Sequence, residues 1–168
     1  MNSEITTPCI GVCSTIYGDD ICRGCHRSFN EIIEWNSLSS AKKIKILERL
    51  ENLQIKHSSK YLFVYDKDLL IKKFNELNIR PININKDKNK DVKTISMAYQ
   101  LIRHNISNIT LENLNSFGIS LNKKPETSLI SPKDNIDNLN NLITKIDEAI
   151  YKDSEQNLAQ MNTTTTGE

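Results

Sequence analysis

Residues 8–35 read PCIGVCSTIYGDDICRGCHRSFNEIIEW and contain all four cysteines of the 168-residue chain. The cysteines form two close pairs, Cys9 with Cys13 and Cys22 with Cys25, joined by a short polar loop. A Cys-x-x-Cys turn supplies two sulfur ligands from one tight backbone bend, and a zinc ion takes four such ligands at tetrahedral corners. Four thiolates hold an iron–sulfur cluster equally well. The spacing therefore predicts a metal centre and leaves it open between one zinc ion and one iron–sulfur cluster.

Two disulfides are the alternative use of these cysteines. The chain begins with the polar residues MNSEITT rather than with an apolar export signal. A chain that stays in a reducing compartment keeps its thiols, and clustered cysteines there usually bind metal. No segment approaches the roughly 18 apolar residues of a membrane span. We therefore expect a cytoplasmic protein without a membrane segment, whose metal ligands are Cys9, Cys13, Cys22 and Cys25.

The side chains beside the second pair have more than one interpretation. His26 directly follows Cys25, and adjacent residues reach the same metal ion only with difficulty, so we expect His26 to support the site rather than to bind the metal. Arg23 and Arg27 flank the same pair. They could offset the negative charge of a four-thiolate site, or they could contact a phosphate or an acidic partner. The sequence leaves both roles open.

This cysteine-rich stretch resembles a bacterial family, domain of unknown function 1289, which includes YdhL-like predicted iron–sulfur proteins. The resemblance covers about residues 5–55, roughly the first third of the chain. The residues that carry it are Thr7, Pro8, Cys9, Cys13, Cys22, Gly24, Cys25, Arg27, Ser28, Glu31, Ile32 and Trp35. His26 stands where the family often has a small residue. The resemblance implies a metal-binding module and supplies no enzymatic activity.

The hydrophobic pattern of the chain predicts a mainly α fold with a small β component. Ser28 and Glu31 form a capping box before a short helix, and Trp35 is expected to pack over the metal site or the next helix. That next helix is expected at about residues 41–55. The metal knuckle and these two helices make up a predicted four-cysteine module at residues 1–57. The unit is too small for a large core, so the metal would supply much of its folding free energy.

The rest of the chain predicts a helical or α+β extension at residues 58–152. Strands are expected at 61–65 and 81–84, and helices at about 67–77, 92–103 and 132–150. Thr110 is expected to cap a short helix that Gly118 ends. The amphipathic helix at 132–150 is expected to pack into the core, with pairing to another subunit as the alternative. Residues 153–168 are polar and are expected to form a disordered tail.

The order of elements after Tyr61 is similar to the second half of the proofreading-type DEDD exonucleases. The residues that match are Tyr65, Asp66, Leu69, Leu70, Thr94, Ala98, Leu111, Glu112, Leu114, Gly118, Ile119 and Asp137. These exonucleases hold two divalent metals with four carboxylates. The Asp-x-Glu of their leading strand and the histidine before their last aspartate are missing here. We therefore expect no nuclease activity, with Asp66 acting as a helix cap and Asp137 as a solvated carboxylate.

Charge and histidine content separate the remaining functional hypotheses. The net charge of +1 gives no overall attraction to nucleic acid or membrane. Residues 61–104 nevertheless carry nine Lys and Arg against five Asp and Glu. None of the three histidines belongs to a recognisable catalytic motif. We expect a non-catalytic interaction module that binds metal and an unidentified protein partner. The alternatives are an iron–sulfur redox carrier or sensor, and a nucleic-acid-binding protein with a degenerate, inactive exonuclease-like C-terminal part.

Overall fold

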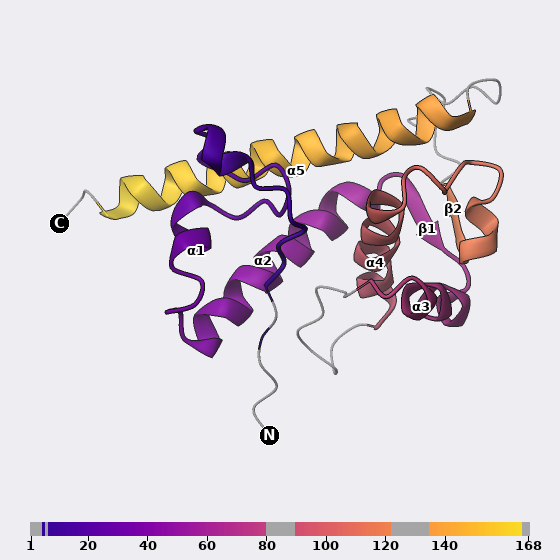
Figure 1. Cartoon of the computed structure of the whole chain (residues 1–168), viewed down its shortest axis with the longest axis horizontal. Coiled ribbons are helices and arrows are strands. Elements are labelled where there is room, and N and C mark those ends of the chain that lie inside the picture. The colour runs from indigo at the N-terminus through magenta and orange to yellow at the C-terminus, as the bar shows by residue number, and fades with distance from the viewer. Residues whose placement is uncertain (1–4, 6, 80–89, 122–134, 166–168) are drawn as a thin grey trace. The chain divides into compact units, whose positions relative to one another are not determined.

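The computed structural model describes residues 5, 7–79, 90–121 and 135–165, and its elements are mostly helices (Figure 1). In chain order they are the 3-10 helix η1 (Ser14–Tyr17), α1 (Phe29–Ile33), α2 (Ser40–Ser58), β1 (Leu62–Val64), α3 (Lys67–Glu76), α4 (Lys90–His104), the 3-10 helix η2 (Leu114–Phe117), β2 (Ile119–Leu121) and α5 (Asn135–Thr165). The prediction of a mainly α fold with a small β component is confirmed. No described helix combines the length and the apolar character needed to span a bilayer.

The chain divides into two compact units. Unit 1 comprises Met1–Leu53 and Asp147–Glu168, and unit 2 comprises Gln54–Ile146. Helices α2 and α5 therefore each contribute residues to both units.

In unit 1 the polypeptide enters α1 through the predicted capping box. The Ser28 hydroxyl accepts a hydrogen bond from the Glu31 backbone N–H at 3.3 Å, and the Glu31 carboxylate accepts one from the Ser28 N–H at 2.9 Å. Both bonds satisfy donors that the first turn of a helix leaves unpaired. The Glu31 carboxylate also lies 2.7 Å from Arg49 of α2. The capping box therefore starts α1 and also ties it to α2.

In unit 2 two short strands form an antiparallel ribbon, and α3 follows the first of them in the chain. Leu62, Phe63 and Val64 of β1 pair with Leu121, Ser120 and Ile119 of β2. The Asp66 carboxylate caps α3 by accepting from the Leu69 N–H at 2.9 Å, as predicted for a helix-capping aspartate. The fully buried apolar side chains of this unit are Leu62, Leu70, Phe74, Ala98, Tyr99, Leu101, Ile102, Ile109, Ile119, Leu139 and Ile146.

Several predicted boundaries in unit 2 differ from the structure. The strand predicted at residues 61–65 is β1, at Leu62–Val64. It pairs with β2 at Ile119–Leu121, a strand that was not predicted from the sequence. The predicted strand at 81–84 lies outside the described residues. The short helix after Thr110 is a turn followed by η2, and Gly118 ends η2 with a φ of 74°. Helix α4 begins at Lys90, slightly before the predicted start. The start predicted for the last helix, at Pro132, lies outside the described residues.

The largest difference concerns the end of the chain. A disordered tail was expected from Asp153, whereas α5 continues to Thr165. Neither glycine nor proline occurs between residues 135 and 165, so nothing in the backbone chemistry stops the helix there. Ser154 is only 1% exposed, and its hydroxyl donates to the Ile150 carbonyl oxygen at 2.9 Å. Polar composition was therefore a poor guide to this segment, because part of it is buried in unit 1.

Candidate metal centre

The four predicted ligands come from two successive loops of unit 1. Cys9 and Cys13 precede η1, and Cys22 and Cys25 lie in the turn before α1. Cys9 is exposed, Cys13 is half-buried, and Cys22 and Cys25 are buried. All four are free thiols. The inner pair is thus enclosed by the fold, whereas the outer pair is more exposed.

The turn that carries the inner pair is closed by backbone hydrogen bonds. The His26 N–H donates to the Cys22 carbonyl oxygen at 2.8 Å, and the Cys22 N–H donates to the Arg27 carbonyl oxygen at 2.8 Å. His26 adopts a left-handed φ of 58°, which lets the chain reverse at this point. An isolated β-bridge between Ile21 and Ser28 clamps the base of the turn. Because these bonds do not depend on the thiols, the sulfur atoms remain available to a ligand.

A close backbone contact brings the two cysteine pairs together. A side-chain carbon at Gly24 would clash with the Val12 carbonyl oxygen and would lie 3.3 Å from Ile10 Cγ1. The Cys22 thiol lies 3.6 Å from the same Val12 oxygen and donates toward it. Only glycine allows such an approach. Gly24 therefore lets the Cys22–Cys25 turn rest on the backbone between Cys9 and Cys13.

Each sulfur atom has at least one polar neighbour. The Gly11 N–H donates to Cys9 Sγ at 3.5 Å, and Thr15 Oγ1 lies 3.0 Å from Cys13 Sγ. Arg27 Nε donates to Cys25 Sγ at 3.3 Å within a buried environment. Donors of this kind stabilise sulfur that carries negative charge. The donors from Gly11 and Arg27 favour the thiolate forms of Cys9 and Cys25, whereas the Cys22 thiol itself donates to a carbonyl oxygen.

The inner pair is electrostatically asymmetric. Burial raises the pKa of the Cys25 thiol, and the hydrogen bond and charge of Arg27 only partly oppose that effect. Burial also acts to raise the pKa of Cys22, but hydrogen bonds from the Cys25, Ser14 and Gly24 backbone outweigh it, and the pKa of Cys22 is lowered. Cys22 is therefore the more readily ionised member of the pair.

The donor set fits a soft metal by its chemistry, since four unpaired thiols with polar neighbours are what zinc or an iron–sulfur cluster uses. Within the described residues, however, no three cysteine, histidine, aspartate or glutamate side chains converge in an arrangement that could hold a metal ion. Cys13 and Cys22 instead turn to Thr15 and Val12. The four cysteines are thus near one another without forming an assembled metal site.

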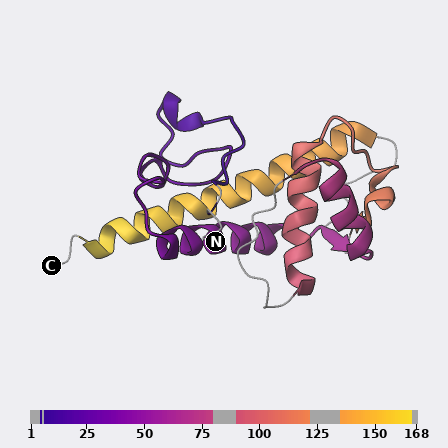
Figure 2. The ribbon, with the colours of Figure 1, turned by 60° about the horizontal axis from the view of Figure 1, so that its bottom comes forward.

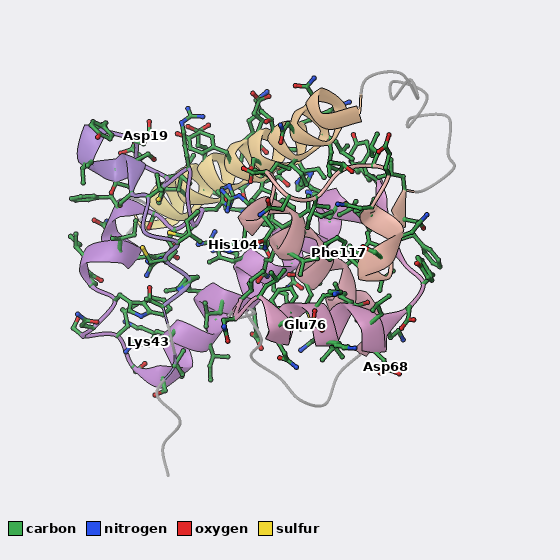
Figure 3. All side chains as sticks on the ribbon, turned by 45° about the vertical axis from the view of Figure 1, so that its right-hand side comes forward. Asp19, Lys43, Asp68, Glu76, His104 and Phe117 are labelled. Atoms are coloured by element: carbon green, nitrogen blue, oxygen red, sulfur yellow. The ribbon has the colours of Figure 1, made fainter. Side chains whose placement is uncertain are left out.

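Side chains of the turn that carries the inner pair contact α5, whose ribbon runs beside the cysteine-rich loops in Figure 2. The His26 imidazole is buried, and its Nε2 lies 3.7 Å from Asp147 Oδ1 on α5. Arg23 lies over the Tyr151 ring and forms an ion pair with Asp19, which is labelled in Figure 3. No spacing in the sequence points to Asp147 or Tyr151, because both lie more than a hundred residues from the turn.

Trp35 contacts Arg27, the arginine that donates a hydrogen bond to Cys25. It is 6% exposed, and the Arg27 guanidinium carbon lies 4.7 Å from its ring centroid. Lys43 of α2 lies on the same ring at 5.8 Å. Trp35 thus contacts both α2 and the residue that donates to Cys25. The tryptophan is a packing residue of unit 1, and Arg27 connects it to the thiol.

Comparisons with known proteins agree with the family resemblance of this segment. Residues 7–54 match the family model described as protein of unknown function (DUF1289). This match confirms the resemblance that the cysteine pattern indicated and covers all four cysteines, α1 and most of α2. No curated protein matches the chain, and no solved structure matches it either.

Proposed function

We propose that this protein is a small cytoplasmic metal-binding protein whose Cys9, Cys13, Cys22 and Cys25 hold one zinc ion or one iron–sulfur cluster. The observation that carries the proposal is the contact of Gly24 with the Val12 carbonyl oxygen. It brings two separate cysteine pairs together at a position where a larger residue would force them apart. Loading requires the Cys13 and Cys22 thiols to exchange their present hydrogen-bond neighbours for the metal, which is a local side-chain change.

The state of the thiols supports a reducing compartment and a metal role. None of the four cysteines is in a disulfide, and clustered free thiols in such compartments usually bind metal. Unit 1 has a short α1 and few buried apolar side chains near the two loops. A bound metal would add folding free energy to this small module.

The proposed role is that of a non-catalytic interaction module. The loop and α1 expose several large apolar side chains, namely Val12, Ile16, Tyr17, Phe29 and Ile33. A contiguous patch of exposed apolar side chains is typical of protein-binding surfaces. A protein partner is therefore proposed for this segment. The alternative role is an iron–sulfur redox carrier or sensor, which uses the same four ligands and is favoured if the metal is iron.

The test is an anaerobic purification of the full-length chain, followed by an absorption spectrum and elemental analysis of the same sample. About one zinc per chain without visible bands supports a structural zinc module. Iron with matching sulfide and a visible band supports the redox alternative. A protein with neither metal and four titratable thiols would end the proposal.

Substitutions sharpen this test. Cys22→Ser and Cys25→Ser should each lower the metal content, because each removes one soft ligand. Ile16→Ser is the matched control, since it places the same hydroxymethyl group at a 73% exposed position of η1, between the two cysteine pairs. This control should keep the metal content of the natural protein.

A further inference from the structure

Arg27 is a buried cation with an incomplete set of partners. It is only 3% exposed. Its Nε donates to Cys25 Sγ at 3.3 Å, and its guanidinium lies over the Trp35 ring. Its Nη1 is buried and has no hydrogen-bond acceptor among the described residues. No carboxylate in the described part of the chain forms an ion pair with it.

Such a group is unfavourable without a counter-charge. Arginine stays protonated at all physiological pH values, and a buried charge is tolerated only when it is paired and hydrogen-bonded. The Trp35 face offsets part of this charge but accepts no hydrogen bond in the plane of the guanidinium. The Cys25 sulfur is the one polar acceptor that the described residues place on this side chain. The charge of Arg27 is therefore matched only when sulfur beside it carries negative charge.

We propose that Arg27 is the positioning and charge-compensating residue of the metal site. This inference rests on the proposed metal-binding function. Four thiolates around a divalent cation, or around an iron–sulfur cluster, form a net negative centre, and Arg27 supplies the buried positive charge that it needs. The Nε of Arg27 positions the Cys25 sulfur by its hydrogen bond, and the Trp35 ring holds the plane of the guanidinium. The Nη1 of Arg27 is the donor proposed for a second sulfur of the metal-bound site.

The proposal predicts opposite effects of one substitution on the two states of the protein. Arg27→Met fills a similar volume and removes the buried charge. The metal-free protein should then keep or gain thermal stability, because the uncompensated cation is gone. The affinity for Zn²⁺ should fall about tenfold to a hundredfold, as is usual when a residue supporting a metal ligand is lost. An arginine with a purely structural role would instead lower the stability of the metal-free protein.

The experiment uses the full-length chain and three variants, Arg27→Met, Arg27→Lys and Arg23→Met. Zn²⁺ affinity is measured by competition with a chromophoric chelator, and the thermal midpoint is measured in excess chelator. Arg27→Lys should give an intermediate affinity, since it keeps the charge and loses the planar fork. Arg23 flanks the same cysteines with a side chain that is 62% exposed, so Arg23→Met should leave the affinity unchanged. The emission of Trp35, the only tryptophan in the chain, should respond to Zn²⁺ in the natural protein and respond less in Arg27→Met.

The outcomes separate the two proposals. An affinity loss confined to the Arg27 variants, with an undiminished metal-free midpoint, supports the role of Arg27. Unchanged affinity in Arg27→Met overturns that role while leaving the metal site standing. A midpoint of the metal-free protein that falls together with the affinity also overturns it, because the arginine is then structural. A natural protein that binds neither Zn²⁺ nor a reconstituted iron–sulfur cluster overturns the metal site and the role of Arg27 together.

Discussion

The guanidinium carbon of Arg23 lies 4.4 Å from the centroid of the Tyr151 ring, so the turn between Cys22 and Cys25 contacts α5. His26 of the same turn lies with Nε2 3.7 Å from Asp147 Oδ1. Asp147 and Tyr151 lie outside the residues that match the family model. In this chain, therefore, a helix from beyond the family segment completes the unit that contains the cysteines.

The contact between Arg23 and Tyr151 should contribute measurably to stability. Tyr151→Ala removes the ring under the guanidinium and should lower the free energy of unfolding by about 0.5–1 kcal/mol, the range for a partly exposed cation–π pair. Urea unfolding followed by circular dichroism measures it. Tyr17→Ala is the control, because Tyr17 is 86% exposed. In a double-mutant cycle with Arg23→Ala, additive losses would show that the two side chains do not interact.

Substitutions of the two capping-box residues of α1 should lower the free energy of unfolding for different reasons. Ser28→Ala removes the acceptor of the Glu31 N–H and should lower the free energy of unfolding by about 1 kcal/mol. Ser28→Thr keeps a hydroxyl and should recover most of that loss. Glu31→Gln keeps an acceptor for the Ser28 N–H but gives up the ion pair with Arg49. If Ser28→Ala and Ser28→Thr unfold at the same urea concentration, the hydroxyl is not acting as a cap.

A buried hydrogen-bonded triad in unit 2 should be sensitive to removal of one member. Gln54 Oε1 accepts from Ser96 Oγ at 2.7 Å and from Gln100 Nε2 at 2.8 Å, and all three residues are buried. Gln54→Ala removes an acceptor that two buried donors share and should cost about 1–3 kcal/mol in urea unfolding.

The matched comparison for this triad is the combined variant Gln54→Leu, Ser96→Ala and Gln100→Leu. It removes this acceptor together with both of its donors and should lose less stability than Gln54→Ala. A combined variant that loses more stability than Gln54→Ala would mean that the triad contributes through packing rather than through its hydrogen bonds.

Local features were predictable from the sequence because their causes are local. Ser28 and Glu31 are three residues apart, and their side chains need only each other's backbone to form the cap. Gly118 ends η2 with a positive φ, which glycine adopts without strain. The grouping of the four cysteines follows in the same way from two short loops.

Features that depend on long-range contacts could not be predicted from the sequence. The partner of β1 is a three-residue strand, too short to give a period-two pattern of its own. Past Asp153, α5 continues through Ser154, which is buried, and no local pattern signals a buried serine. Arg27 was ambiguous for the same reason, because its role depends on its burial against Trp35 and Cys25.

His104 should make unit 2 less stable in mild acid. It lies at the end of α4 (Figure 3), where partial desolvation of the imidazole and then the neighbouring Arg103 lower its pKa. The unfolded chain therefore takes up a proton near pH 6.5 before the folded protein does. The free energy of unfolding should fall as the pH drops through that value, and it should level off below the folded-state pKa.

The variant His104→Gln isolates this effect, because it removes the titrating ring. Unfolding in urea at about pH 7.5 and about pH 5 should show a smaller acid loss in the variant than in the natural protein. Identical losses in the two proteins would assign the acid sensitivity to other groups.

Gly24→Ala should separate the two cysteine pairs. The added carbon would clash with the Val12 carbonyl oxygen, and overpacking of this kind costs about 1–3 kcal/mol. Gly18→Ala is the matched control. Gly18 has a φ of 99° with no atom within 4 Å of an added carbon, so its substitution strains the backbone by about 1–2 kcal/mol without moving a neighbour.

The two glycine variants should therefore lose similar stability but differ in metal content. Elemental analysis after anaerobic purification should find the metal depleted in Gly24→Ala and retained in Gly18→Ala, because only the first change displaces one pair from the other. Full metal content in both variants would mean that the ligands assemble without the contact between Gly24 and Val12. The contact between Gly24 and Val12 would then no longer support a four-cysteine site. The Cys22–Cys25 turn alone would remain as the candidate metal site.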